Sequence, residues 1–327
     1  MQAMKRKVAL ALLSASFACA QAPSEAQTFP VKPLRIIAGF APGGPNDIIA
    51  RALAARLTES LSQTVTVENR TGAGGNLAAE LVARAAPDGH TLMLGSTGTN
   101  SVNPALYPKL SFDLIKDLAP VTQVASGSSV LAIHPKVAAR NVRELIALAK
   151  AQPGRLTFAS SGGGSSLHLA GELFKQLAGV DMVHIPYKGE QPAVTDLLSG
   201  QVDMSFAPAT NVVPYGKSGK LILLGVTGTA RSGYSGDVPT IADSGVPGFD
   251  VTTWYGVFAP AAAPDSVIAR LHTEIGRAMQ APQIREQLLN LGIEVALSAS
   301  PAAFRAYQAA EVEKWGKLVR ASGAKAD

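Results

Sequence analysis

The chain has 327 residues, of which 47% are hydrophobic and 16% are charged, with 31 glycines, 21 prolines and a formal net charge of +5. This composition excludes a disordered chain, which would be more charged and less apolar, and the length suits one large or two medium domains. The basic residues are scattered and no aromatic cluster lies among them, so a nucleic-acid partner is not expected.

The N-terminus has the pattern of an export signal over residues 1–26. Basic residues at 5–7 precede an apolar stretch at 8–18, which is far short of the ~20 residues that a membrane span needs. Small residues follow, and we expect cleavage after one of three alanines, Ala20, Ala22 or Ala26. Ser24 and Ala26 fit the small-x-small rule and favour the third site.

The single cysteine, Cys19, lies inside this signal. Lipidation at Cys19 is the less favoured alternative, because Ser16 stands where lipoprotein signals usually carry a leucine. Cleavage after Ala26 leaves a mature chain without cysteine. Its net charge falls from +5 to +3, because the three basic residues at 5–7 and Glu25 are removed.

Short apolar runs alternate with segments of helical period along the rest of the chain. We expect strands at residues 34–40, 65–68, 91–95, 121–125, 130–134, 156–160, 202–206, 221–226 and 254–259. Apolar residues at helical spacing predict helices between them, namely Ile49, Leu53, Leu57 and Leu61, then Val142, Leu145, Ile146 and Ala149, then Ile268, Leu271, Ile275 and Met279, and finally Phe304, Tyr307, Trp315, Leu318 and Val319. This alternation predicts an α/β fold with parallel sheets covered on both faces.

The first strand leads into the turn at 41–47, where Gly43 and Gly44 leave the backbone free to approach a ligand. We expect Asn46 to cap the following helix, with Asp47 in its first turn. Free amides at a helix start bind anions, although a plain strand–helix turn explains the spacing equally well. The missing Gly-Lys-Ser/Thr excludes a nucleotide P-loop.

Two further glycine-rich turns follow. Residues 72–75 imitate part of a dinucleotide fingerprint, but Leu77 occupies the third glycine position, so no nucleotide is inferred. The stretch SSGGGSSLHLAGELF begins at Ser160, and Ser165 or Ser166 is expected to cap a helix starting near Leu167. This loop has no lysine or arginine, so it suits a small carboxylate better than a triphosphate, and a flexible loop is the alternative.

Nucleophilic and metal chemistry have little support in the sequence. There is no Gly-x-Ser-x-Gly elbow, the five histidines are far apart, and no Cys/His metal spacing occurs. Ser165 and His168 could touch at i, i+3, which keeps an exported hydrolase as an alternative, but no acid orients the pair. We expect His168 to pack or cap, and we expect neither an enzyme nor a cofactor.

Four segments together resemble the substrate-binding proteins of tripartite tricarboxylate transporters, also called the Bug family. They are FPVKPLRIIAGFAPGGPNDIIAR, VTVENRTGAGGNLAAELVARAAPDGHTLMLGS, SGGGSSLHLAGELF and HIPYKGEQPAVTDLLSGQVDMSFA. They occur in the family's order, and the resemblance covers essentially the whole mature chain.

The resemblance implies a two-lobed, type II-like periplasmic binding protein, with a mostly parallel sheet flanked by helices in each lobe and the ligand cleft between the lobes. The chain would cross between lobes near 125–130 and 249–254. Lobe one would comprise residues 27–127 and 252–327, and lobe two residues 128–251.

The resemblance also implies that loop amides, hydroxyls and ordered water hold a carboxylate that lobe closure traps. Lobe one would contribute Phe40, Gly43, Gly44, Asp47, Ala73, Gly74, Ser96, Thr97 and Asn103. Lobe two would contribute Ser160, Gly163, Gly164, Ser165 and Ser166, with His168, Tyr187 and Lys188 behind them.

Two positions depart from the family's pattern. Pro45 replaces a glycine or small polar residue and removes one N–H donor. Ala207 stands where many relatives carry an aspartate, and residues 206–213 offer no carboxylate to pair with an amine. We therefore expect amine-free carboxylic acids to be preferred over amino acids, unless Asp203 faces the cleft.

The implied function is capture of a small organic carboxylate, either a di- or tricarboxylate or an aromatic acid, and its delivery to a membrane permease. The alternative is a ligand-dependent partner of a sensor kinase, which the sequence does not separate from the first. We expect a monomer with no metal.

Overall fold

The computed structural model describes residues 29–107, 109–163 and 165–324. The expected signal segment with Cys19, the cleavage sites and Gly164 lie outside the described residues. The chain divides into two compact units, Met1–Val31 and Lys32–Asp327, and everything below belongs to the second. None of the described helices has the length and apolar character required to cross a bilayer.

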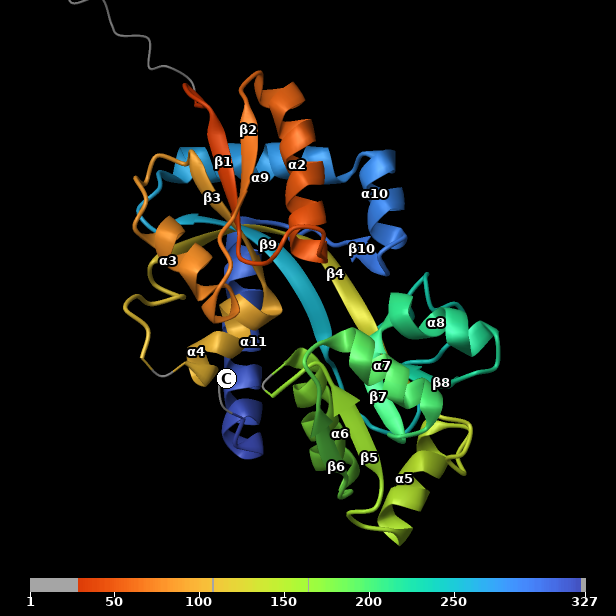
Figure 1. The fold of residues 1–327 in the computed structure, drawn as a ribbon. Helices are drawn as coiled ribbons and strands as arrows, with labels where there is room; N and C mark the ends of the chain where they lie inside the picture. Colours follow the sequence, from red (N-terminus) through yellow and green to blue (C-terminus); the bar gives the residue numbers. More distant parts are fainter. Residues whose placement is uncertain (1–28, 108, 164, 325–327) are drawn as a thin grey trace, which may run out of the picture. The chain divides into compact units, whose positions relative to one another are not determined.

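In the described part of the chain, ten strands form one mixed sheet with the order β2-β1-β3-β9-β4-β7-β5-β6, and both β8 and β10 also pair with β4 (Figure 1). The strands are β1 (Leu34–Ala38), β2 (Val65–Asn69), β3 (Thr91–Ser96), β4 (Leu118–Ile133), β5 (Thr157–Ser160), β6 (Val183–Pro186), β7 (Met204–Pro208), β8 (Ile222–Val226), β9 (Thr252–Pro260) and β10 (Ile293–Val295).

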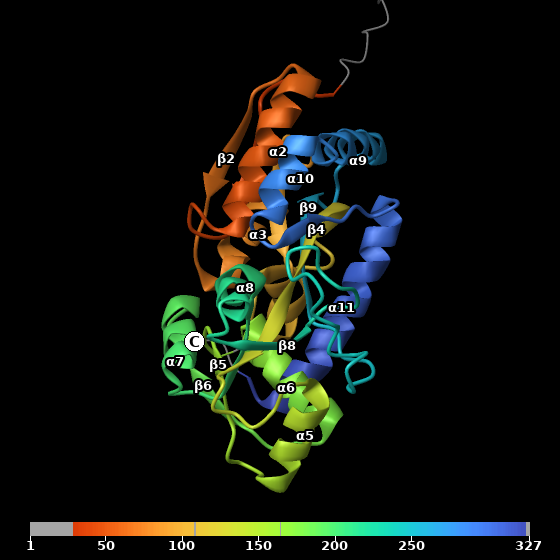
Figure 2. The same cartoon turned by 90° about the vertical axis from the view of Figure 1, so that its right-hand side faces the viewer.

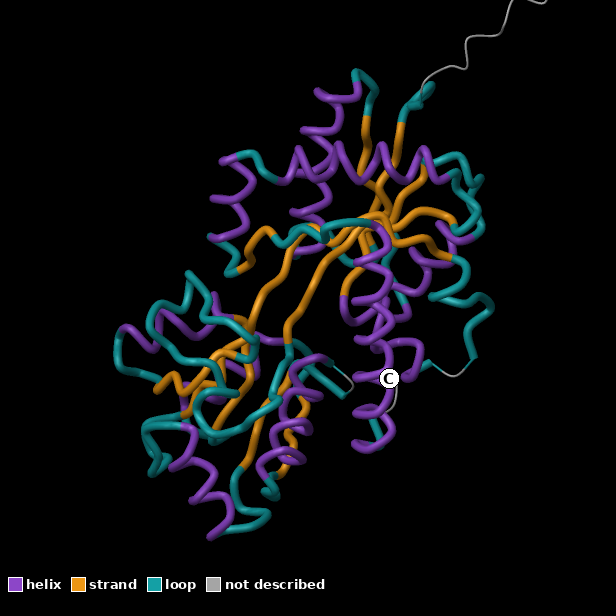
Figure 3. Tube along the Cα trace, turned by 180° about the vertical axis from the view of Figure 1, so that it is seen from behind, coloured by secondary structure: helices purple, strands orange, loops and turns teal. Residues whose placement is uncertain are grey.

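Helices connect these strands and cover the sheet (Figure 3). They are α2 (Pro45–Leu61), α3 (Asn76–Ala83), α4 (Asn103–Leu106), α5 (Val142–Ala151), α6 (Ser166–Ala178), α7 (Glu190–Ser199), α8 (Ala209–Lys217), α9 (Asp265–Met279), α10 (Pro282–Leu289) and α11 (Pro301–Ser322). A 3₁₀ turn at Ala73–Gly75 and a π-helical turn at Gly98–Val102 lie at strand ends.

The outer ladders are parallel and the central ladders are antiparallel. Strand β1 pairs in parallel with β2 and β3, and β5 pairs in parallel with β6 and β7. Every ladder of β4 and β9 is antiparallel. The expected two-lobed α/β class is confirmed, and within it parallel outer strands are joined by an antiparallel centre.

The long strand β4 joins the two lobes. It pairs with β9 from Leu118 to Ser128 and with β7 from Ser129 to Ile133, so its partners change at one point along its length. Figure 1 shows β4 and β9 running side by side from β1, β2 and β3 at one end towards β7 and β8 at the other. The sequence predicts two separate strands here, because Gly127 and the serines beside it are poor strand formers. Backbone bonds to β9 and β10 hold the segment extended despite that composition.

The largest fully buried aromatic side chains lie in two separate cores. One contains Ile37, Met93, Trp254, Phe258 and Phe304, all fully buried. The other contains Phe158, Phe174, Phe206, Phe249 and Trp315. The predicted helical stripes are confirmed, since the four apolar residues of α2, at positions 49, 53, 57 and 61, are all buried.

Helix α11 takes part in both cores, because Phe304 near its start packs in the first and Trp315 near its end packs in the second. Figure 2 shows α11 alongside β4. The carboxylate of the buried residue Glu311 accepts the indole N–H of Trp254 at 3.3 Å and that of Trp315 at 2.9 Å. Lys314 also pairs with this carboxylate. One buried charge therefore ties α11 to the start of β9.

Candidate functional site

The turn between β1 and α2 is held by backbone geometry. Gly43 has a φ of +87°, which favours glycine, and Gly44 is the N-cap of α2, with Pro45 as the first helical residue. The expectation that Asn46 caps this helix is wrong. Asn46 is inside the helix and its Nδ2 donates to the Leu94 carbonyl at 3.1 Å, because burial against β3 gives this amide a tertiary partner.

Asp47 supports this turn through its buried carboxylate. The carboxylate accepts the backbone N–H of Gly43 at 3.0 Å and Nδ2 of Asn69 at 2.9 Å. Arg51 Nε lies 3.0 Å from each carboxylate oxygen. Hydrogen bonding to Arg51 is the main reason that the pKa of Asp47 falls to about 2. Asp47 is thus an ionised residue that fixes the position of Gly43.

The turn at 72–75 lies beside the first one. All four residues have positive φ, and a Cβ on Gly39 would come within 2.9 Å of the Gly75 Cα. The Gly74 carbonyl accepts Oγ1 of Thr99 at 2.8 Å and Nδ2 of Asn103 at 3.0 Å. Asn103 therefore supports the turn from beneath, and Ala73 is exposed at its surface.

The other predicted residues of lobe one have structural partners. Ser96 N–H donates to Oδ1 of Asn100 at 3.2 Å, and Thr97 Oγ1 accepts the backbone N–H of Trp254 at 2.7 Å. Both residues are buried. Phe40 is 38% exposed, and its carbonyl accepts a hydrogen bond from the Asn69 side chain at 3.0 Å.

The serine–glycine loop after β5 is organised by its own hydroxyls. Ser165 is the N-cap of α6, as predicted, and its Oγ accepts the His168 backbone N–H at 3.2 Å. The same hydroxyl donates to the Gly162 carbonyl at 2.8 Å. Ser160 Oγ lies 2.7 Å from His184 Nε2, and Ser166 is the first residue of α6.

Two histidine rings stack behind this loop. The rings of His168 and His184 are parallel to within 8°, with centroids 3.9 Å apart, and the Phe158 ring also stacks on His184, with centroids 4.9 Å apart. Burial lowers the pKa of both histidines, that of His184 to about 4. His168 therefore packs, as expected, and Ser165 is engaged in capping instead of facing a base.

Tyr187 and Lys188 lie in the connection from β6 to α7. The Tyr187 hydroxyl donates to Oδ2 of Asp196 at 2.7 Å, and burial together with this carboxylate raises the pKa of Tyr187 to about 12. The Lys188 side chain is exposed.

A cleft of about 480 Å³ lies between the β1–α2 turn and the N-terminal ends of α7 and α8, with β4 and β9 along it. This volume is within the range of small-molecule sites. Its lining residues are Gly43, Pro45, Gly127, Ser128, Ser129, Glu190, Gln191, Pro208, Ala209, Thr210, Asn211, Thr253, Tyr255, Leu291, Gly292 and Ile293. Of the predicted site residues that the structure describes, Gly43 is in this lining.

Glu190 is an acidic lining residue that the sequence motifs do not single out. It is the first residue of α7 and is half-buried. In the described part of the chain, its Oε2 is shielded from solvent and has no hydrogen-bond partner. Burial raises the pKa of Glu190 to about 7, while a hydrogen bond with Ser161 opposes that rise. The bond to Ser161 connects the serine–glycine loop to the edge of the cleft.

The cleft is lined by both apolar and polar residues, but no basic side chain is among the described lining residues. Serine, threonine, asparagine, glutamine and tyrosine side chains supply neutral hydrogen-bonding groups. Burial also raises the pKa of Tyr255 to about 12, so it remains a neutral donor at physiological pH. A carboxylate bound here would be held by neutral donors. Within the described residues, no group of acidic, histidine or cysteine side chains is suited to hold a metal ion.

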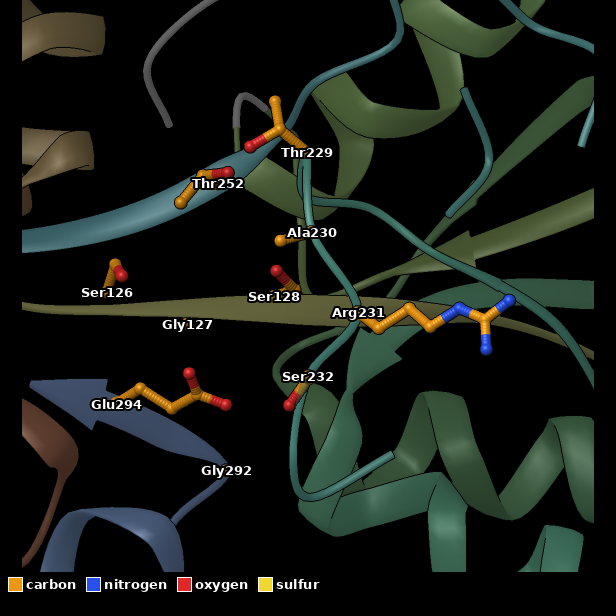
Figure 4. Close-up of a pocket in the computed structure, with 10 residues that line it drawn as sticks. All are labelled: Ser126, Gly127, Ser128, Thr229, Ala230, Arg231, Ser232, Thr252, Gly292 and Glu294. Carbon is orange, nitrogen blue, oxygen red and sulfur yellow. The ribbon is translucent and has the colours of Figure 1, made fainter. Parts of the chain in front are cut away.

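The neighbouring pocket at the crossing strands is smaller, about 110 Å³, and shares Gly127, Ser128 and Gly292 with the cleft (Figure 4). The Glu294 carboxylate accepts the Gly233 backbone N–H at 2.9 Å. Figure 4 shows the Arg231 guanidinium pointing away from the other labelled side chains. The small volume makes this pocket less suitable for an organic acid than the cleft.

The structure decides where Asp203 lies. Its Oδ2 accepts the backbone N–H and hydroxyl of Thr157 at 2.8 and 2.9 Å, and Oδ1 pairs with Lys136 at 3.2 Å. Asp203 is therefore engaged at the start of β5, and Ala207 is fully buried in β7. The carboxyl group that lines the cleft comes from Glu190.

The chain is similar to proteins of one receptor family. The family profile described as "Tripartite tricarboxylate transporter family receptor" matches residues 49–324. Protein BugT of Bordetella pertussis is 37% identical over 305 residues, which are 93% of each chain. The structure titled R. palustris Rpa4515 with adipate has a TM-score of 0.75 and 31% identity, covering 91% of this chain and 99% of that one. MatC from Rhodopseudomonas palustris with bound malate has a TM-score of 0.71 and 34% identity, covering 89% and 100%.

Proposed function

The chain belongs to the tripartite tricarboxylate transporter receptor family, as its sequence motifs indicate, and we propose that it captures a small organic carboxylate for transport. The family and fold are those of periplasmic substrate-binding receptors. The observation that carries the proposal is the 480 Å³ cleft lined by neutral hydrogen-bonding groups. Relatives of similar fold were solved with adipate and with malate, which supports a dicarboxylate as the ligand.

The proposed lobes are residues 27–127 with 252–327 and residues 128–251. The change in the pairing partners of β4 after Ser128 supports this division. We propose that closure brings the turn at Gly43 and Gly44 towards the loop at Ser160–Ser166. A carboxylate that gains charge-assisted hydrogen bonds from both lobes binds the closed state better and shifts the population towards it.

The predicted site residues have different proposed roles. Gly43, Gly44, Gly163 and Ser166 would contact the ligand, with Ala73 at the cleft edge. Asp47 would act by fixing Gly43, and Asn103 by supporting Gly74.

The proposed partner of the closed, ligand-bound protein is the membrane permease of a tripartite transporter. We further propose export through the signal at 1–26 and a monomeric state. A tight complex of purified receptor and permease in the presence of ligand would support this partner, and no complex under any ligand condition would contradict it.

The test of the function is a thermal-shift screen of the purified, ligand-free mature protein against citric-cycle acids, longer dicarboxylates, aromatic acids and amino acids. A ligand that binds only the folded state raises the melting temperature as its concentration passes its dissociation constant. A shift with one class of acid is expected. No shift with any acid would contradict carboxylate binding.

A further inference from the structure

We propose that Glu190 makes ligand binding proton-linked, so that an anionic ligand binds best when this carboxyl group is neutral. The inference rests on the proposed function, because it concerns the same cleft. The regulating group, Glu190, lies on α7 and outside the glycine-rich loops that the sequence predicts as ligand contacts.

The position of the carboxyl group is the first observation. Glu190 lines the cleft, yet its Oε2 is shielded from solvent and has no hydrogen-bond partner among the described residues. A carboxylate in such a position lacks a donor for Oε2, and leaving a shielded oxygen unpaired disfavours the ionised form. A neutral carboxyl group fits this position better, because burial disfavours the charge more than the hydrogen bond with Ser161 favours it.

The composition of the lining is the second observation. No lysine, arginine or histidine is among the described residues that line the cleft. An ionised Glu190 would either stay buried without a counter-ion or turn its charge into the cleft. In both cases its negative charge would repel a bound carboxylate, because no lining cation offsets it.

The groups around Glu190 keep their charge between pH 6 and pH 8. Helix α7 packs against β5 and β7, which carry no titratable side chain between Thr157 and Ser160 or between Met204 and Pro208. Tyr187 in the preceding connection and Tyr255 across the cleft both have their pKa raised to about 12. His184, behind the serine–glycine loop, has its pKa lowered to about 4.

Three other charged or titratable groups lie near this segment. Lys188 precedes it on the surface, Asp196 further along α7 accepts the Tyr187 hydroxyl, and the pKa of His168 is lowered by burial. None of the three is in the cleft lining. If ligand affinity changes between pH 6 and pH 8 in wild type but not in Glu190→Gln, the change is therefore assigned to Glu190.

The first experiment measures adipate binding by calorimetry at pH 6.0 and pH 8.0. We compare the mature wild type, Glu190→Gln and Glu286→Gln, which alters an exposed glutamate on α10 as the matched control. With a carboxyl group titrating near pH 7, the dissociation constant of wild type and control should rise about tenfold from pH 6 to pH 8. Glu190→Gln should bind at pH 8 about as tightly as wild type binds at pH 6.

The second experiment needs no ligand. Carbon-13 NMR of side-chain carboxyl groups should show one glutamate titrating near pH 7 in wild type, and this signal should be absent from Glu190→Gln. A midpoint below about pH 5.5 overturns the inference.

The outcomes separate the two proposals. Adipate binding with no pH dependence, or binding that tightens as pH rises, overturns the role of Glu190 and leaves carboxylate binding intact. If adipate and the other acids of the screen all fail to bind, the proposed function is contradicted, and the carbon-13 midpoint still tests the neutral carboxyl group.

Discussion

Replacing Asp47 by asparagine should destabilise the protein by about 2 kcal/mol at pH 7. Asparagine has the shape of a protonated aspartic acid, so the substitution removes the charge while leaving the side-chain volume unchanged. The pKa of Asp47 is lowered from 3.8 to about 2, and each pKa unit corresponds to about 1.4 kcal/mol of stability at neutral pH. The Asp47 side chain is 4% exposed but that of its partner Arg51 is 53% exposed, so solvent screening keeps the expected loss near the lower figure of about 2 kcal/mol.

The sign of the pH dependence follows from the lowered pKa. The folded state holds the ionised form more strongly than the unfolded state does, so the stabilisation is complete above about pH 4 and is lost as pH falls towards 2. About half of it should remain at pH 3. The difference between wild type and Asp47→Asn should therefore shrink between pH 7 and pH 3.

Urea unfolding of both proteins at pH 7, 4 and 3 measures this difference directly. Glu313→Gln is the matched control, because Glu313 forms an exposed pair with Lys317 on α11 and the loss of such a pair should leave stability nearly unchanged. Equal unfolding free energies for wild type and Asp47→Asn at pH 7, or a difference that stays constant down to pH 3, would refute the role assigned to Asp47.

Three further variants test other parts of the structure. Gly44→Val should abolish carboxylate binding. Stability should be unchanged, because a Cβ there lies 3.7 Å from its nearest neighbour and the φ of −82° suits any residue. Calorimetry showing wild-type affinity would remove this turn from the site. Glu311→Ala should cost about 3 kcal/mol in urea unfolding, since two buried indole N–H groups lose their acceptor, and a cost under 1 kcal/mol would contradict this. Wild type should lose stability as pH falls from 6.5 towards 4, because His184 binds a proton more readily in the unfolded chain than in the folded one. His184→Phe should reduce that loss. Parallel profiles of stability against pH for the two proteins would disprove the assignment.

Local periodicity determined much of the secondary structure. The stripe at 49, 53, 57 and 61 predicts the buried face of α2, since residues four apart lie on one side of a helix. The predicted cap at Ser165 is also confirmed, because a serine side chain can reach the N–H three residues ahead without help from the rest of the fold.

Predictions failed where a distant partner outweighs local preference. Asn46 has a good side chain for a cap, but the Leu94 carbonyl of β3 binds it instead. Strand β6 was missed, because its edge position leaves Val183 exposed and gives no apolar run. Strand β10 has three residues, which is too short for a periodic signal.

The sequence by itself determined the α/β class, the glycine-rich turns and the receptor family, because these depend on residue types and spacing that are local to each segment. The tertiary structure decided that residues 118–133 form one strand between lobes, since only pairing with β9, β10 and β7 keeps a glycine–serine segment extended. It also decided that Asp47 supports the turn and that Glu190 lines the cleft. Burial and charge at these two positions are set by residues far away in the chain, such as Asn69 for Asp47, and no local pattern records them.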